Sequence, residues 1–131
     1  MMSKKHEFSP EEIIEFGLRH AYGKLIKDGY EVLSVMPEPN VDPQILAKID
    51  EQLYFIVVRT DVYPNVGDLP SISRISQVNE HAKKHGAITK FLSLGIVNAN
   101  AKTEEEKSKL YRGGEFYINY SGLKELVRVI R

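Results

Sequence analysis

Residues 41–61 read VDPQILAKIDEQLYFIVVRTD, and this stretch decides the fold. Two apolar segments, 45–49 and 53–60, are separated by a short turn with two acidic residues, which predicts a β-hairpin. The second segment is continuously apolar from Leu53 to Val58. Such a run favours a central strand that is covered on both faces, because a half-exposed strand alternates apolar with polar residues. We therefore expect this hairpin to lie inside a larger sheet.

The segment before the hairpin predicts a helix and then a strand. Ser9 and Glu12 have the spacing of a capping box, with a proline between them that suits the first helical turn. The helix should run to Asp28, because the glycine that follows provides a left-handed C-terminal stop. Residues 30–36 read as a strand that is ended by prolines. Residues 1–8 are expected to be a flexible N-terminal tail.

The segment after the hairpin begins with a proline-containing loop and continues with helices and strands. The expected elements are a helix at 71–85, a strand at 87–97, a charged helical turn or interaction arm at 102–109, a strand at 115–120 and a final helix capped by Ser121. The final helix would present one apolar face, made of Leu123, Leu126, Val127 and Ile130. This order predicts a single α/β domain over residues 1–131, with a central mixed sheet that contains an antiparallel meander and is flanked by helices.

The composition is that of a soluble globular protein. The chain has 131 residues, 42% of them hydrophobic, and Lys plus Arg equal Asp plus Glu at 18 each. A balanced charge lowers the expectation of a general nucleic-acid-binding surface but allows a local basic patch. The lack of cysteine excludes disulfides, thiolate nucleophiles and cysteine-based zinc sites. No apolar run is long enough to cross a bilayer or to form a secretory signal, so we expect a cytoplasmic location and no membrane contact.

The element order, together with the positions of Pro43 and Arg59, resembles the restriction-endonuclease-like fold of the PD-(D/E)xK superfamily. The resemblance covers residues 9–97. In that superfamily an Asp follows the Pro, and an acidic residue stands two positions before a Lys. The corresponding positions in this chain read Gln44, Val57 and Arg59. The resemblance therefore implies the architecture of a nuclease with a degenerate active site.

The resemblance also implies roles for residues on the first two helices. The first helix of the superfamily often carries a Glu that faces the site, and Glu12 or Glu15 would correspond to it. The second helix often carries a polar residue aimed at the scissile phosphate, and Gln77 stands at a matching place.

The residues at the three motif positions argue against catalysis. Mg²⁺ is held by carboxylate oxygens, whereas Gln44 offers only a neutral carbonyl oxygen and Val57 offers no ligand. Arg59 keeps a positive charge but cannot release a proton near neutral pH. We therefore expect a non-catalytic domain that binds no metal and no cofactor.

The alternative is a divergent Mg²⁺-dependent nuclease that uses Glu15, Asp42 or Asp61. The simpler interpretation of the two aspartates is that they are turn and loop residues that bracket the hairpin. His81 and His85 have the spacing of a helical zinc pair, but lysines stand between them and the catalytic Glu of such motifs is missing. A zinc site is therefore not expected.

One face of the second helix carries polar residues at spacings of three, four and three, namely Arg74, Gln77, His81 and Lys84. With Arg59 beside it, this face could contact phosphates, or it could be an ordinary solvated helix face. The expected function is thus binding of nucleic acid or of a protein partner, with a small α/β protein-interaction or immunity-type protein as a further alternative. The strands contain tyrosines that we expect to be half-buried packing residues, Tyr54, Tyr117 and Tyr120.

Overall fold

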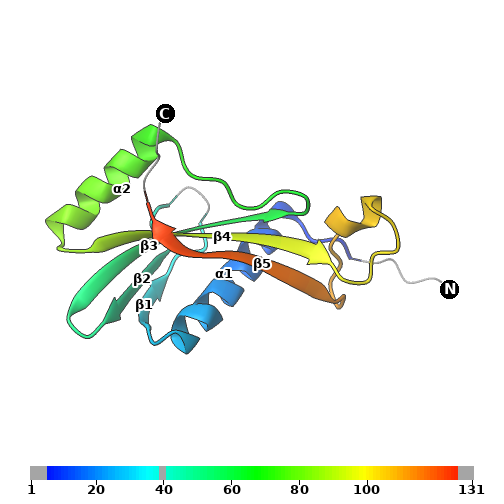
Figure 1. Ribbon diagram of the computed structural model, residues 1–131, viewed down its shortest axis with the longest axis horizontal. Coiled ribbons are helices and arrows are strands. Elements are labelled where there is room, and N and C mark those ends of the chain that lie inside the picture. The colour runs from blue at the N-terminus through cyan, green and yellow to red at the C-terminus, as the bar shows by residue number, and fades with distance from the viewer. Residues whose placement is uncertain (1–5, 39–40, 127–131) are drawn as a thin grey trace.

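β3 (Gln52–Val62) lies at the centre of the sheet, as its continuous apolar sequence predicts. The computed structural model describes residues 6–38 and 41–126, in which five strands follow the order β1-β2-β3-β4-β5 (Figure 1). The other strands are β1 (Glu31–Val35), β2 (Ile45–Ile49), β4 (Ile88–Asn98) and β5 (Phe116–Glu125). β1, β2 and β3 form an antiparallel meander, β4 is parallel to β3, and β5 is antiparallel to β4. The prediction of a single α/β domain with a mixed sheet is confirmed.

Two helices cover opposite faces of this sheet (Figure 1). α1 (Pro10–Lys27) buries Leu18, Ala21 and Leu25 in one apolar cluster with residues of β2, β3 and β4. α2 (Ile72–Lys84) buries Ile75 and Val78 in a second cluster on the other face. Because β3 is buried between the two clusters, its apolar side chains have neighbours on both sides. No helix in the described part of the chain is both long enough and apolar enough to span a bilayer.

The helix boundaries follow the capping signals. The Ser9 hydroxyl accepts a hydrogen bond from the backbone N–H of Glu12, and the Glu12 carboxylate accepts one from the backbone N–H of Ser9. The Ser71 hydroxyl accepts a hydrogen bond from the backbone N–H of Arg74 at the start of α2. Gly29 has a positive φ of 96°, which suits a residue without a side chain. The predicted capping box and both helices are confirmed.

β5 is longer than predicted, and the expected helix from Ser121 is wrong for the described residues. The strand continues to Glu125, and Leu123 pairs with Leu92. The pairing with β4 is irregular at residues 121–122, where Gly122 has a positive φ of 78°. This extra residue in the strand lets Tyr120 and Leu123 both pack on the α1 side although they are three residues apart. Leu126 packs on the α2 side, because residues at an odd spacing in an extended segment point to opposite faces, so the spacing of three between Leu123 and Leu126 is not helical. Val127 and Ile130 lie outside the described residues.

The tyrosine predictions have mixed outcomes. Tyr54 is half-buried and its ring meets that of Tyr30 edge to face at 5.3 Å between centroids. Tyr120 is half-buried, and its hydroxyl donates to the backbone carbonyl of His20 at 3.2 Å. Tyr117 is 67% exposed, so the prediction for this residue is wrong. It lies on the face of β5 opposite to that of its half-buried neighbours Phe116 and Ile118.

The distal end of the β4–β5 hairpin carries the charged segment and the first described residues. A short 3₁₀ helix, η1 (Glu105–Ser108), forms within the predicted 102–109 turn. Residues 6–8 of the expected tail run beside residues 110–112, where the backbone N–H of Phe8 donates to the carbonyl of Leu110 at 2.8 Å. Residues 1–5 of that tail lie outside the described residues.

Two glycines of α1 allow a matched test of how closely this helix packs on β3. A Cβ on Gly17 would lie 2.7 Å from the Thr60 Cβ, whereas a Cβ on Gly23 would meet no described atom within 4 Å. We expect Gly17→Ala to lower the free energy of unfolding by about 1–3 kcal/mol through overpacking. Gly23→Ala should raise it by about 0.5–1 kcal/mol, because alanine favours the helix. Urea denaturation measures both, and equal stability of the two variants would contradict the close contact.

Candidate functional site

The candidate site forms where three elements meet around the carboxylate of Asp42. Asp42 precedes β2, Arg59 lies on β3, and Arg74 lies in the first turn of α2. The Asp42 side chain is only 2% exposed, whereas those of Arg59 and Arg74 are 24% and 38% exposed. A carboxylate this deeply buried needs compensation by cations and hydrogen-bond donors. Two arginines from different elements provide it.

The guanidinium group of Arg59 contacts Asp42 in a bidentate manner. Its Nη1 and Nη2 atoms donate to Oδ1 and Oδ2 of Asp42, each at 2.8 Å. The Nη1 atom of Arg74 donates to the same Oδ2 at 3.1 Å. Two parallel hydrogen bonds between a guanidinium and a carboxylate are among the strongest ion-pair geometries in proteins, so this contact fixes both side chains.

Gln44 is the third residue that donates a hydrogen bond to the Asp42 carboxylate. Its Nε2 atom donates to Oδ1 of Asp42 and to the carbonyl of Val41, both at 2.6 Å. Its Oε1 atom accepts the backbone N–H of Val58 at 2.8 Å. The Gln44 residue is 3% exposed, so both ends of its amide are used inside the protein. The side chain therefore joins the start of β2 to β3.

The ionisation state of Asp42 follows from these contacts. Burial is the largest influence and would raise the pKa of its carboxyl, but the contacts with Arg59, Gln44 and Arg74 together outweigh burial and hold the pKa below its ordinary value of 3.8. The Coulombic attraction of Arg59 and the hydrogen bond from Arg74 act in the same direction. Asp42 is therefore a carboxylate at neutral pH, shared between two cations.

The three motif positions have different fates. Gln44 and Arg59 both contact Asp42, whereas Val57 is fully buried in the apolar cluster under α2.

Among the residues described by the structure, no three or more His, Asp or Glu side chains are grouped as they would be around a metal ion. Asp61 is exposed, and its carboxylate accepts its neighbour's backbone N–H at 2.7 Å. Glu15 is exposed on α1 and lines a separate hollow beside that helix.

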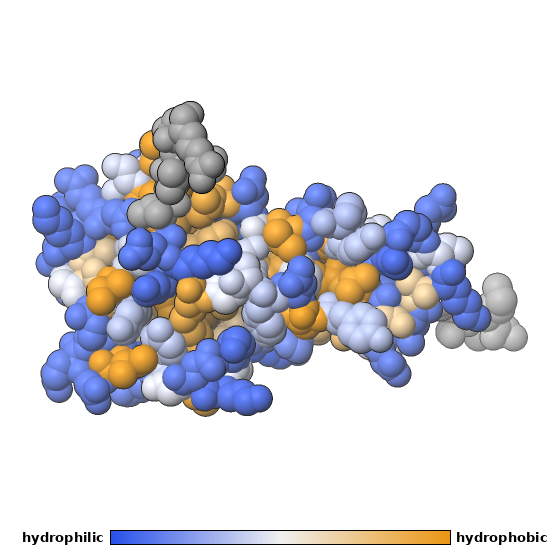
Figure 2. All heavy atoms as spheres, in the orientation of Figure 1, coloured by the Kyte–Doolittle hydropathy of each residue, from blue (hydrophilic) through white to orange (hydrophobic). Residues whose placement is uncertain are grey.

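A groove of about 380 Å³ runs between Asp42 and α2. It is lined by Val41, Asp42, Arg74, Gln77, Val78 and His81. Three of the four residues predicted to share one face of α2 thus line the groove, and Lys84 lies one turn further along the helix. α2 carries Arg74, Lys83 and Lys84 against one acidic residue, Glu80, and its outer side is largely hydrophilic (Figure 2). The groove is consequently polar and next to an excess of positive charge.

The two histidines of α2 make ring contacts. The His81 ring lies 5.3 Å from that of Phe55 and 4.8 Å from that of His85, measured between centroids. Because the three rings pack on one another, the His81–His85 pair has a packing role.

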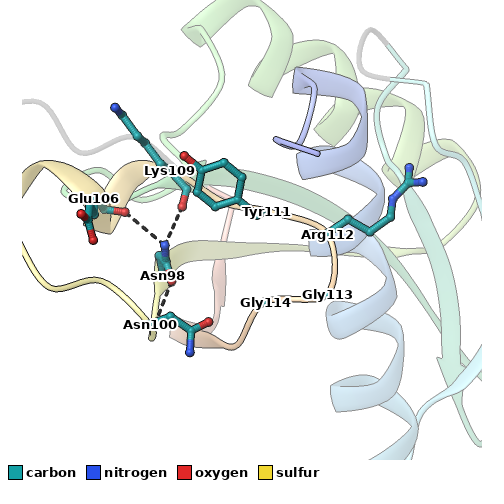
Figure 3. A pocket seen from close by; sticks show the side chains of 8 residues that line it. All are labelled: Asn98, Asn100, Glu106, Lys109, Tyr111, Arg112, Gly113 and Gly114. Atoms are coloured by element: carbon teal, nitrogen blue, oxygen red, sulfur yellow. Dashed lines mark hydrogen bonds between the residues drawn. The ribbon is translucent and has the colours of Figure 1, made fainter. Parts of the chain in front are cut away.

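A second hollow, of about 450 Å³, lies at the distal end of the β4–β5 hairpin (Figure 3). The amide nitrogen of Asn98 donates to the carbonyls of Glu106 and Lys109, and its oxygen accepts the backbone N–H of Asn100. The Asn100 side chain in turn accepts the backbone N–H of Glu115 at 2.9 Å. These amides hold the η1 segment against the hairpin, so their polar atoms serve the local fold.

Sequence reasoning identified Arg59 and the α2 face but missed the role of Asp42, which it interpreted as a turn residue. One signal could have found it. Arg59 follows directly on the apolar run 53–58 of the central strand, and a cation at such a place requires a nearby anion. The nearest acidic residue that flanks the partner strand on the same side is Asp42.

A model of a protein family described as a domain of unknown function (DUF8840) matches residues 11–126, so the chain belongs to that family. The match extends from α1 to the end of β5 and therefore includes Asp42, Arg59 and Arg74. No curated protein and no solved structure matches the chain.

The buried ion pairs predict a large effect of one substitution. Asp42→Asn removes the negative charge that Arg59 and Arg74 share, and we expect it to lower the free energy of unfolding by about 3 kcal/mol. Asp61→Asn is the matched control on the same sheet, because Asp61 is exposed, and it should change stability by less than about 0.5 kcal/mol. Urea unfolding at neutral pH measures both changes. Equal effects of the two variants would contradict a central role of the Asp42 carboxylate.

The same contact predicts how stability depends on pH. The folded-state pKa of Asp42 is lowered, so its ion pairs contribute stability that is present above the ordinary value of 3.8 and is lost as pH falls through the folded-state pKa. Glu12, whose pKa is lowered to about 2 by hydrogen bonds from His6 and Arg112, acts in the same direction. The stability difference between the natural chain and Asp42→Asn should therefore shrink below about pH 4. A difference that stays constant on acidification would contradict this account.

Proposed function

We propose that this chain is a non-catalytic binding domain of restriction-endonuclease-like architecture, which binds the phosphate backbone of nucleic acid along the groove beside α2. The observation that carries the proposal is the Asp42 carboxylate, whose oxygens accept hydrogen bonds from Arg59, Arg74 and Gln44. The order of α1, an antiparallel meander, α2 and a parallel β4 supports the architectural part.

Hydrolysis through a bound Mg²⁺ has little support from the site. A metal ion of this kind needs converging carboxylate oxygens, and a carboxylate already paired with two guanidinium groups is a poor ligand for a cation. Val57 contributes only apolar surface, and the Gln44 oxygen already accepts a backbone N–H. The nuclease alternative would have to recruit Glu15 and Asp61, which lie in separate environments.

Binding of phosphate has support from the distribution of charge. The guanidinium groups of Arg59 and Arg74 both contact the one carboxylate of Asp42. Both arginines are partly exposed, and Gln77 and His81 place further hydrogen-bonding groups along the groove. Lys84 continues the basic surface along α2. A phosphate group that enters the groove would meet Arg74, which the Asp42 carboxylate fixes in place, and this fixed position reduces the entropy cost of binding. Arg59 lies behind this contact and lines a separate hollow on the α1 side.

Fluorescence anisotropy with labelled single-stranded DNA, double-stranded DNA and RNA tests the proposal. We expect binding at low salt that weakens as salt rises, because cations of the protein displace counterions of the phosphates. Lys84→Ala should weaken binding and remove about one unit from the slope of log affinity against log salt. Lys27→Ala, which removes an exposed lysine from α1, should change neither quantity.

The same samples test the absence of catalysis. Incubation with Mg²⁺ or Mn²⁺ should leave each nucleic acid intact and should not change its affinity. Cleavage that disappears in Asp42→Asn would overturn the non-catalytic part of the proposal. Lack of binding at low salt, or an equal loss in Lys27→Ala and Lys84→Ala, would overturn the nucleic-acid part.

A further inference from the structure

β5 is a long edge strand, that is, a strand at the border of the sheet. It extends from Phe116 to Glu125 and pairs with β4 on one side, and no strand of the described residues pairs with its other side (Figure 1). The opposite border strand, β1, has five residues and an irregular pairing between Val32 and Ser34. Short border strands discourage pairing with other chains, whereas long ones offer a row of backbone donors and acceptors. The pairing of β5 with β4 is regular from Phe116 to Tyr120 and is irregular at residues 121–122.

The first part of β5 lacks the usual protection of an exposed border. Residues 116–121 contain neither a charged residue nor a proline, either of which would oppose pairing with another strand. Tyr117 is 67% exposed in this segment. Hydrophobic residues also reach the molecular surface between hydrophilic ones along β4 and β5 (Figure 2). The open border of β5 is thus suited to a partner strand.

The side chains of β5 are self-complementary in one antiparallel register. A two-fold axis through Asn119 places Ile118 opposite Tyr120 of a second copy. In the pairing with β4, residues 121–122 stand opposite the single residue Ser93, and in the second copy they would stand opposite Tyr117 in the same way. The pairs that follow are therefore shifted by one residue. Phe116 then lies opposite Leu123 of the second copy, and Glu115 lies opposite Lys124. The symmetry repeats each of these contacts, so the pairing contains two ion pairs of opposite charge.

The faces of the sheet agree with this register. Phe116 contacts the ring of Phe16 in α1, and Leu123 packs against the cluster under α1, so both lie on the α1 side. Lys124 lines a hollow with Phe91 on the α2 side, the side to which the exposed Glu115 and Tyr117 also belong. Residues that face each other across an antiparallel pair must point to the same side of the sheet. Both the apolar pair and the charged pair satisfy this condition.

We propose that two copies of this chain associate through β5 into a symmetric dimer with one continuous ten-stranded sheet. The two-fold axis is perpendicular to the sheet, so both α2 helices lie on the same face of the dimer. Pairing along a border buries less surface than most stable interfaces, so the association is reversible and depends on concentration. The proposal stands on β5 alone and does not depend on nucleic-acid binding.

Sedimentation equilibrium over a dilution series tests the dimer with charge-reversal variants. Lys124→Glu and Glu115→Lys each place like charges opposite one another, and each should weaken dimerisation about tenfold. The double variant restores opposite charges in exchanged positions and should recover the affinity of the natural chain. Lys27→Glu, a charge reversal of an exposed lysine on α1, should leave dimerisation unchanged. Glu115 and Lys124 are both exposed, so we expect each variant to fold, and circular dichroism checks this.

Three outcomes would overturn the proposal. The natural chain could remain monomeric at every concentration. The single variants could dimerise as tightly as the natural chain. The double variant could dimerise no better than either single variant, which would exclude the Glu115–Lys124 pairing.

Discussion

The buried carboxylate of Asp42 is the contact on which the arrangement around β3 depends. A carboxylate withdrawn from water costs several kcal/mol unless cations and donors surround it, and each donor here belongs to a different place in the fold. Arg59 belongs to β3, Arg74 belongs to α2, and Gln44 directly precedes β2, so the contacts with Asp42 hold these three elements together. The position of α2 over the sheet is therefore set by electrostatics at its first turn and by apolar packing of Ile75 and Val78 further along.

This contact also limits the chemistry available at the end of β2. The same oxygens cannot both accept hydrogen bonds from two arginines and serve as the anionic ligands of a hard cation without losing one set of partners. Val57 adds a second limit, because α2 covers it and any charged side chain there would be buried without a partner. The contacts that stabilise the core thus already occupy the polar atoms at this end of β2.

The parts of the fold that were predictable from the sequence have local signals. The helix at 10–27 has a capping box and a terminal glycine, and the β2–β3 hairpin has a short turn between apolar runs. β5 was mispredicted beyond Tyr120 because its irregularity at Ser121–Gly122 changes which residues share a face, and this depends on the partner strand. The site was half predictable: the α2 face follows from helical spacing, but the contact of Asp42 with residues 17 and 32 positions away depends on tertiary structure.

The groove and the open border of β5 are physically separate, and this separation shapes what the domain can do. The groove lies beside α2 and is held by Asp42, whereas β5 is separated from β3 by β4. Pairing through β5 would leave every contact of Asp42 unchanged and would bring two basic helices to one face. An extended anionic ligand could then contact both grooves at once, and the second contact would gain from the high effective concentration created by the first. Weak ligand binding in each groove and weak dimerisation would in that case strengthen one another, because a ligand bound to both copies also holds the two β5 strands together.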